Sequence, residues 1–96
     1  MFVVSENVKK SLSESNKFTD EMLTILKKYR RQNWGDIPEE EKQRNDNAYK
    51  YKNDCILAMY NTSKGYVYIN TNIDRSQTNI LFSNEYKNER NIKNEQ

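Results

Sequence analysis

Asp74-Arg75-Ser76 is the polar group in this chain best suited to chemistry, and it lies between two apolar segments that resemble β-strands. An arginine held rigidly between two strands can make a bidentate contact with a carboxylate or a phosphate. The same residues also suit a hairpin turn, in which Asp74 accepts backbone N–H bonds and Arg75 pairs locally. The sequence leaves both interpretations open, so Asp74 and Arg75 are candidate partner-binding residues.

Two tyrosines form a second candidate surface. Tyr66 and Tyr68 are two residues apart in an expected strand, so they point to the same face of the sheet, and Tyr60 of the preceding strand could join them. Aromatic rings on an antiparallel sheet can stack on unpaired bases, anchor a protein interface or pair with one another across strands. The sequence does not choose among these three roles.

Charged residues gather in two clusters, each at the end of an expected helix. The basic cluster is Lys27, Lys28, Arg30 and Arg31. The acidic cluster is Asp36, Glu39, Glu40 and Glu41. The helix dipole favours acids at a helix start and bases at a helix end, which accounts for both clusters as solvated surface. The alternatives are that the bases bind nucleic acid and that the acids imitate phosphates against a partner's basic groove.

The composition argues against most catalytic and metal chemistry. The chain has no His, one Cys and two Gly, so it lacks the usual general base, a zinc cage and a phosphate-cradling loop. We therefore expect a protein that is not an enzyme and binds no metal or cofactor. Cys55 cannot form an intramolecular disulfide, and we expect it to be a small core residue. Trp34 is expected to be a packing anchor between two helices.

Length and charge indicate one small domain whose surface is nearly neutral. The chain has 96 residues and a net charge of +2. Residues 1–34 carry seven basic and four acidic residues, and residues 35–54 carry four basic and six acidic ones. Neither excess approaches that of a dedicated duplex DNA binder, although the polarity could steer a partner. With no signal peptide or apolar span of ~20 residues, we expect a cytoplasmic protein without membrane association.

The first half of the chain predicts helices. Residues 2–4 are either an edge strand or the lead-in to a short helix over residues 6–12. Thr19 is expected to cap the clearest helix, whose apolar stripe contains Met22, Leu23, Ile25, Leu26 and Tyr29. Gly35 is expected to end that helix. Asp36 and Glu39 form a capping box for a third helix that runs to about residue 52, with Ala48, Tyr49 and Tyr51 as core candidates.

The second half predicts a three-stranded antiparallel β-meander on which the helices pack, so the expected fold class is α+β. Residues 55–60 are apolar on both faces, which suggests a central or well-covered strand. A five-residue loop over 61–65 leads to a strand that directs Val67, Ile69 and Thr71 to the core. Residues 74–77 turn the chain into a strand over 78–82. Tyr86 is expected to dock on the domain of residues 1–86, with 87–96 a flexible or frayed tail.

These segments, taken in order, resemble a family of short bacterial proteins that occur on plasmids, phages and integrated elements. The family pattern is a helix pair, W-G-D, an acidic helix start with a nearby Asn, two strands, D-R-S-x-T, a hydrophobic run and E-Y. The corresponding residues are Trp34-Gly35-Asp36, Glu40 and Glu41, Asn45 or Asn47, residues 56–60 and 66–69, Asp74-Arg75-Ser76-Gln77-Thr78, residues 80–82 and Glu85-Tyr86. The resemblance covers nearly all of residues 2–86.

The resemblance implies a genetic setting rather than a reaction. Small non-enzymatic proteins of mobile elements often inhibit host defence, so we expect a counter-defence inhibitor, similar in role to an anti-CRISPR protein, that binds a host defence nucleoprotein complex. The candidate contact surfaces are the Tyr66 and Tyr68 face and the acidic cluster. The alternative is a small nucleic-acid-binding regulator that uses the basic cluster and Arg75. A homodimer would follow if the sheet exposes an apolar face.

Overall fold

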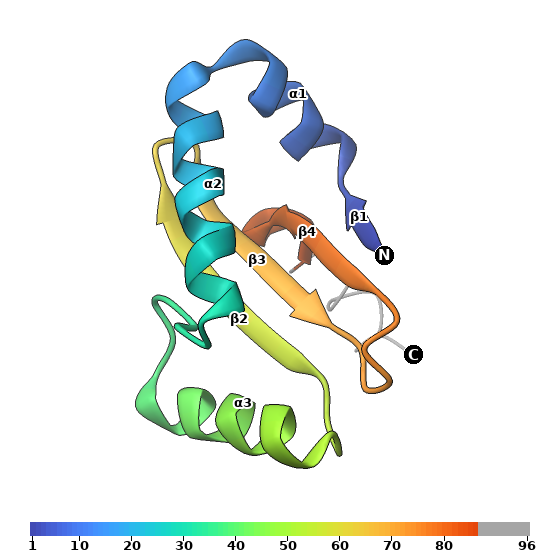
Figure 1. Ribbon diagram of the computed structural model, residues 1–96. Coiled ribbons are helices and arrows are strands. Elements are labelled where there is room, and N and C mark those ends of the chain that lie inside the picture. Colours follow the sequence, from blue (N-terminus) through green and yellow to red (C-terminus); the bar gives the residue numbers. More distant parts are fainter. Residues whose placement is uncertain (87–96) are drawn as a thin grey trace.

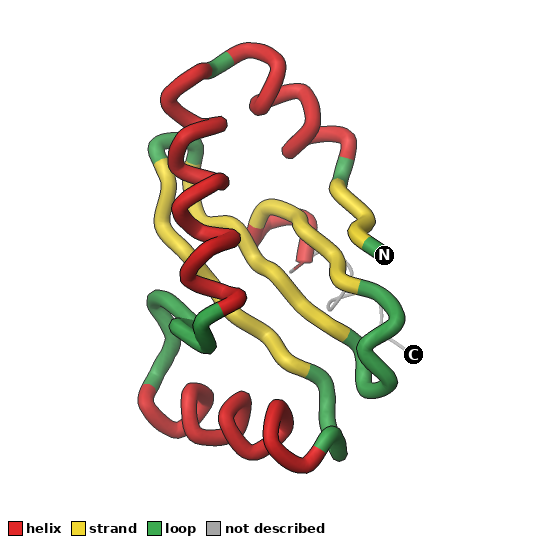
Figure 2. The backbone as a smooth tube through the Cα atoms, in the orientation of Figure 1, coloured by secondary structure: helices red, strands yellow, loops and turns green. Residues whose placement is uncertain are grey.

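A four-stranded mixed sheet, with helices over one face and along one edge, makes up the fold of the computed structural model (Figures 1 and 2). The structure describes residues 1–86, and the tail predicted over 87–96 lies outside the described residues. In chain order the elements are β1 (Phe2–Val4), α1 (Glu6–Glu14), α2 (Asn16–Arg30), α3 (Glu39–Tyr51), β2 (Ile56–Thr62), β3 (Gly65–Thr71) and β4 (Thr78–Phe82). The strand order across the sheet is β1-β4-β3-β2.

The α+β class is confirmed, but the prediction of three antiparallel strands is wrong in detail. β2, β3 and β4 form the expected meander, and β1 adds a fourth strand parallel to β4, with Val3 opposite Asn79. The Ser5 N–H also donates to the carbonyl of Ile80 at 2.9 Å. A three-residue strand is too short to show periodicity, and its partner lies at the other end of the chain, so local sequence cannot reveal this pairing.

Two serines define where the first helices begin. Ser5 Oγ accepts from the Val8 N–H at 3.2 Å, and Ser15 Oγ accepts from the Phe18 N–H at 3.1 Å. α2 therefore begins at Asn16, whereas the sequence predicted a start after Thr19. The Thr19 hydroxyl is inside the helix and donates back to the carbonyl of Ser15, one turn earlier, at 3.1 Å. Ser13, Ser15 and Thr19 are all competing candidates for the cap, and the structure uses Ser15.

Gly35 and Asp36 serve the sheet and not the helix ends that were predicted for them. α2 ends at Arg30, before Gly35, whose φ of 81° belongs to the left-handed region. There Gly35 bridges to Met59 of β2, and a Cβ on Gly35 would lie 2.1 Å from the Met59 carbonyl oxygen. The N-cap position of α3 is Pro38, without a side-chain cap. The Asp36 carboxylate instead accepts from the Asn61 N–H at 3.0 Å.

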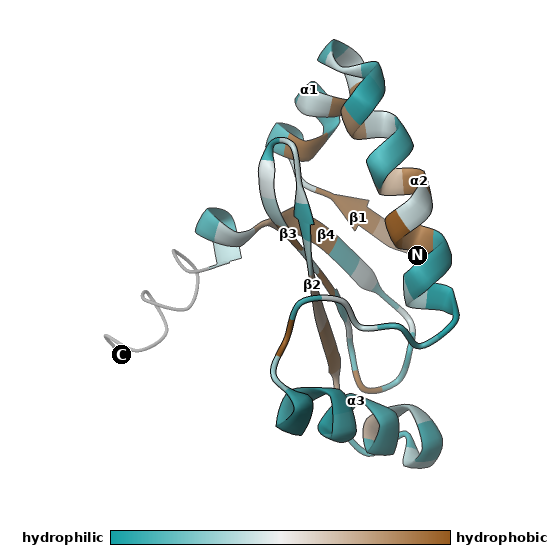
Figure 3. Cartoon of the chain, turned by 90° about the vertical axis from the view of Figure 1, so that its left-hand side faces the viewer, coloured by the Kyte–Doolittle hydropathy of each residue, from teal (hydrophilic) through white to brown (hydrophobic). Residues whose placement is uncertain are grey.

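The hydrophobic core lies on the face of the sheet that α1 and α2 cover, here called the inner face. Its strand residues are Ile56, Ala58, Tyr60, Val67, Ile69 and Ile80. From the helices, Val8 and Phe18 are fully buried, and the Phe18 ring lies 5.7 Å from that of Phe82. Each such side chain contributes roughly 1.5–3 kcal/mol through burial. Figure 3 shows that the strands are mostly hydrophobic and the helices mostly hydrophilic. Leu23, which was predicted to belong to the apolar stripe of α2, is exposed.

Trp34 packs between α2 and α3, as predicted. Its buried ring meets Tyr29 of α2 edge-on at 5.5 Å, and its Nε1–H donates to Asp46 Oδ1 of α3 at 2.8 Å. Of the three core candidates on α3, only Ala48 is buried; Tyr49 and Tyr51 are 52% and 61% exposed. α3 runs along the edge of the sheet, so only a narrow stripe of this helix reaches the core.

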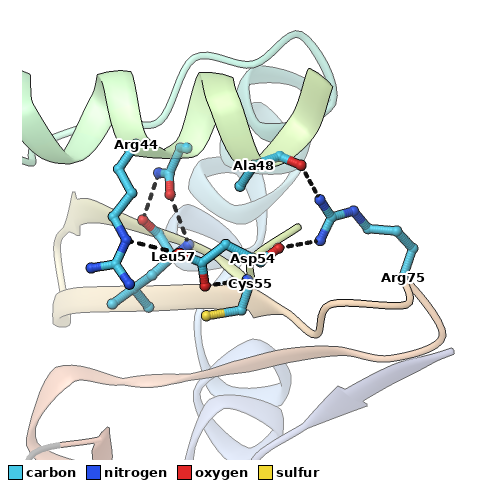
Figure 4. A network of polar contacts seen from close by, with 7 residues as sticks. Arg44, Ala48, Asp54, Cys55, Leu57 and Arg75 are labelled. Carbon is cyan, nitrogen blue, oxygen red and sulfur yellow. Dashed lines mark hydrogen bonds and ion pairs between the residues drawn. The ribbon is translucent and has the colours of Figure 1, made fainter. Parts of the chain in front are cut away.

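β2 is an edge strand, so of the two predicted alternatives, a central or a well-covered strand, the central one is wrong. The edge is nevertheless covered, because the Asn45 side chain of α3 bonds to it in the manner of a neighbouring strand (Figure 4). Asn45 Nδ2 donates to the Leu57 carbonyl at 2.8 Å, and the Leu57 N–H donates to Asn45 Oδ1 at 3.2 Å. Asn45 and Gly35 thus protect an edge that would otherwise offer unpaired backbone groups.

The hairpin between β2 and β3 is tighter than predicted. Thr62 pairs with Gly65, which leaves two loop residues instead of five. Gly65 has a φ of 111°, so the glycine expected at the end of this loop is required by the backbone. The Glu21 carboxylate of α2 accepts from the Ser63 hydroxyl at 2.7 Å and from the Ser63 N–H, which attaches the hairpin to α2.

Candidate functional site

The second face of the sheet, here called the outer face, holds the tyrosines that the sequence singled out. Its residues are Leu57, Met59, Tyr66, Tyr68, Asn70, Asn79 and Leu81. Met59, Tyr68 and Leu81 lie side by side across β2, β3 and β4. Most of this face is half-buried, and Tyr66 is 43% exposed. The outer face therefore combines apolar and aromatic side chains with solvent access, which is the composition of an interface core.

A helical turn over 83–86 lies against the outer face. The Tyr86 ring packs on Tyr68, with the ring centroids 4.8 Å apart, which agrees with the predicted docking of Tyr86. Glu85 fixes this turn, because its carboxylate accepts from the Phe82 N–H at 2.7 Å and from the Ser5 hydroxyl at 3.0 Å. The turn is thus tied to both β4 and the start of α1.

Two hollows lie on either side of Tyr86. The first, of about 490 Å³, extends from Tyr86 to the start of α3, where Ile37 and Pro38 form its wall. The second, of about 380 Å³, extends from Tyr86 toward Val3 of β1. Both lie within the size range of small binding sites, roughly 300–1,000 Å³. A ridge between two hollows gives the outer face a relief that a partner surface could match.

The acidic cluster borders this face. Glu41 lines the first hollow, and Glu39 and Glu40 are exposed in the same first turn of α3. The Asp36 carboxylate accepts a hydrogen bond from the Asn61 N–H. Asn61 is paired with Tyr66 across the β2–β3 hairpin. Of the eight predicted partner-binding residues, the structure brings Glu41 and Tyr68 to one hollow and places Asp36 against Asn61, the strand neighbour of Tyr66. Glu39 and Glu40 share the first turn of α3 with Glu41.

Asp74 and Arg75 lie elsewhere, in the turn from β3 to β4. The Arg75 guanidinium donates to the carbonyl of Asp54 at 2.9 Å and to that of Ala48 (Figure 4). It also donates to the carbonyl of Asn72 at 3.0 Å. Asp74 Oδ1 accepts from the Ser76 hydroxyl at 2.6 Å, and this bond holds the pKa of Asp74 below its usual value. The Asp74 bonds and the Arg75 bond to Asn72 are those that the turn interpretation requires. The Arg75 bonds to Ala48 and Asp54 instead join the turn to distant segments of the fold.

The basic cluster occupies the exposed end of α2. Lys27, Lys28 and Arg30 lie in its last turn, and Arg31 is the C-cap residue. Arg30 and Arg75 line one cavity on the inner side of the sheet, between α2, α3 and β1, whereas the other three residues do not. The residues of the predicted nucleic-acid surface are therefore only partly brought together.

The first hollow is also lined by two residues, Arg44 and Cys55, that the sequence did not indicate as site residues. Arg44 of α3 forms an ion pair with Asp54 at 3.0 Å, which lowers the pKa of the Asp54 carboxyl. Cys55 also lines the hollow, and it is exposed, which corrects its predicted place in the core. The alternation of residues 55–60 correctly grouped Cys55 with Leu57 and Met59. It did not show which of the two faces of the strand is open to solvent.

Comparisons with known protein families, with characterised proteins and with solved structures give no match to this chain. Within residues 1–86, no helix has the length and the apolar character needed to cross a membrane.

Proposed function

We propose that this protein is a non-enzymatic inhibitor that docks on its partner through the outer face. One observation supports the proposal: the inner face is packed by α1 and α2, while the outer face presents Met59, Tyr66 and Tyr68 beside exposed carboxylates. Aromatic residues and Met are enriched at interfaces, and partly exposed aromatic rings are frequent anchors of binding energy. The prediction that the protein is not an enzyme continues to rest on its composition.

The acidic border suggests the chemistry of the partner. Glu41 lines the first hollow of the outer face, and Asp36 binds Asn61 next to Tyr66. Glu39 and Glu40 are exposed in the same helical turn as Glu41. They would meet a basic groove of a protein that binds nucleic acid, and opposite charges across an interface raise the rate of encounter and fix its orientation. With the genetic setting that the family resemblance implies, the proposed partner is a host defence nucleoprotein complex, as for an anti-CRISPR protein.

A cleavage assay with purified defence complexes tests this function. The protein is added to each complex with its target DNA, and inhibition is titrated for the natural chain and for the charge reversal Glu39→Lys/Glu40→Lys/Glu41→Lys. We expect inhibition by the natural chain and at least a tenfold loss in the variant, which corresponds to ~1.4 kcal/mol. The control reverses three other exposed carboxylates, on Glu6, Glu14 and Asp20. Full inhibition by the first variant would remove the phosphate-mimicry component.

A nucleic-acid-binding regulator is the second candidate function, and the exposed basic end of α2 favours it. The side chains of Lys27, Lys28 and Arg30 have no ion-pair partner among residues 1–86. Binding through these residues would weaken steeply with salt, because counterions are released from the phosphates. A mobility-shift titration at low salt tests this candidate, and the absence of any shift would eliminate it.

A further inference from the structure

A cavity on the inner side of the sheet is separate from the outer face. It has a volume of about 450 Å³ and lies between the end of α2, the end of α3 and β1. Figure 1 shows the end of α2 above α3, with β1 at the other edge of the sheet. Ile56 and Thr71, both buried, belong to its lining. Its volume lies within the range of small-molecule sites, roughly 300–1,000 Å³.

Four aromatic residues line this cavity. They come from four different segments: Phe2, Tyr29, Trp34 and Tyr49. Tyr29, Trp34 and Tyr49 form one cluster, with successive ring centroids 5.5 and 6.5 Å apart, whereas Phe2 belongs to β1. Phe2 and Tyr49 are 63% and 52% exposed, so their rings are accessible from solvent. Accessible rings around an apolar floor are suited to stacking on a flat aromatic ligand.

Three cations border the same cavity: Arg30, Lys52 and Arg75. None of them forms an ion pair with a carboxylate in the part of the chain that the structure describes. None of the residues from 1–86 that line the cavity is acidic. The cavity therefore has a positive rim whose charge is not balanced by its own lining, and it suits a ligand that carries negative charge.

The backbone at two of these cations is unusual. Lys52 and Arg75 have φ values of 53° and 65°, in the left-handed region where glycine is easier to accommodate. Only one other non-glycine residue among those described, Gln32, shares this conformation. Lys52 takes this conformation as the C-cap of α3, and Arg75 takes it in the β3–β4 turn, so the ends of two elements place both side chains at the rim. The C-terminal ends of α2 and α3 favour nearby bases through the helix dipole, but the dipole does not account for the four rings between them.

We propose that this cavity binds the base and phosphate of a nucleotide. The base would stack against the accessible rings of Tyr49 and Phe2, and the phosphate would lie toward Arg30 and Lys52. The ligand could be a free mononucleotide or the end of a single strand, since both present the same base and phosphate. The proposal is independent of the outer face and of the inhibitor function.

Trp34 supplies a direct readout, because it is the single tryptophan of the chain and it lines the cavity. Its fluorescence is titrated at low salt with adenosine 5′-monophosphate and with adenosine. We expect saturable quenching by the monophosphate, and about tenfold weaker binding of adenosine, which corresponds to ~1.4 kcal/mol for the phosphate contacts. Absence of a saturable change with either ligand at millimolar concentration would overturn the proposal.

Two variants separate the roles of charge and stacking. Lys52→Gly removes a rim cation and places glycine where the backbone favours it, so the fold is kept. It should weaken binding of the monophosphate about fivefold and leave adenosine unchanged, whereas Tyr49→Ala should weaken both ligands. Gln32→Gly changes the same backbone conformation outside the cavity, and Lys10→Ala removes an equal charge on α1. Equal losses in Lys52→Gly and Lys10→Ala would overturn the proposed site.

A 5′-phosphorylated oligoadenylate distinguishes a free mononucleotide from the end of a single strand as the natural ligand. Much tighter binding of the oligonucleotide than of the monophosphate would assign the cavity to single strands, and equal binding would assign it to free nucleotides; both outcomes support the site. The Glu39→Lys/Glu40→Lys/Glu41→Lys variant should bind the monophosphate as the natural chain does. Loss of nucleotide binding in the cavity and loss of inhibition through the outer face are therefore measured separately.

Discussion

The Arg75 guanidinium donates a hydrogen bond to the backbone carbonyl of Asp54 at 2.9 Å, and so fastens the β3–β4 turn to the connection between α3 and β2. The same guanidinium binds the carbonyl of Ala48, in the last turn of α3. The Ala48 carbonyl also accepts from the Lys52 N–H at the C-cap of α3, at 2.8 Å, and Arg75 adds a second bond from a distant part of the chain. An arginine that could have faced a partner is thus part of the fold.

Replacing Arg75 should cost stability even when the charge is kept. Arg75→Lys retains the positive charge, but a single ammonium cannot reach the three carbonyls that the planar guanidinium spans. We expect the free energy of unfolding to fall by about 1.5–3 kcal/mol, the range for hydrogen bonds to charged groups. Urea denaturation measures the loss, with Arg31→Lys at the exposed α2 cap as the control. Equal stability of Arg75→Lys and the natural chain would contradict this role.

Asn45 should be required for the protection of the β2 edge. Asn45→Ala removes both bonds to the Leu57 backbone and leaves its N–H and carbonyl without that partner. We expect a loss of about 2–3 kcal/mol in the free energy of unfolding, because unsatisfied buried groups cost more than an average hydrogen bond contributes. Asn47→Ala, at an exposed position two residues along α3, is the matched control. Light scattering would reveal any association through the released edge.

The two glycines should differ in their tolerance of a side chain. Gly35→Ala places a Cβ 2.1 Å from the Met59 carbonyl oxygen, so we expect a loss of about 3 kcal/mol or more in the free energy of unfolding. Gly65→Ala meets no atom within 4 Å and should lose only the cost of its backbone conformation, ~1–2 kcal/mol. Thermal denaturation of both variants gives the comparison. A higher Tm for Gly35→Ala than for Gly65→Ala would refute the close approach.

The link between Glu21 and the hairpin should make stability depend on acid pH. The Ser63 hydroxyl donates to the Glu21 carboxylate and lowers its pKa below 4.5. A carboxyl with a lower pKa in the folded state adds stability above its unfolded pKa and loses it as pH falls through the folded pKa. In Glu21→Gln, the fall in the urea midpoint below about pH 4.5 should be shallower than in the natural chain. Glu14→Gln, an exposed loss of charge at the end of α1, is the control.

Local signals in the sequence predicted much of this fold. The alternation of Val67, Ile69 and Thr71 correctly identified the core side of β3, and Trp34 lies between the helices as expected. The place of β1 depends on pairing with β4 at the far end of the chain, which no local pattern encodes. The edge position of β2 was missed because Asn45, a polar residue in a polar helix, replaces a neighbouring strand.

The candidate site was predictable in its parts but not in its assembly. Tyr66 and Tyr68 were assigned to one face from their spacing, and the acids to the start of a helix. The meeting of Glu41 with Tyr68 and of Asp36 with the β2–β3 hairpin depends on the position of α3 along β2. The cavity beside Arg30 combines residues from both halves of the chain, from Phe2 to Arg75, so only the tertiary structure reveals it.

The proposal that the outer face docks on a defence complex is tested most directly by affinity purification with matched variants. Tagged protein is incubated with a nuclease-treated lysate of its host, and retained proteins are identified by mass spectrometry. Met59→Lys/Tyr66→Lys places two charges on the outer face, and Leu23→Lys/Ile73→Lys changes two exposed apolar residues elsewhere. The account predicts that a defence subunit is retained by the natural chain and the second variant and lost by the first. Equal retention by both variants, or the absence of any defence subunit with the natural chain, would contradict it.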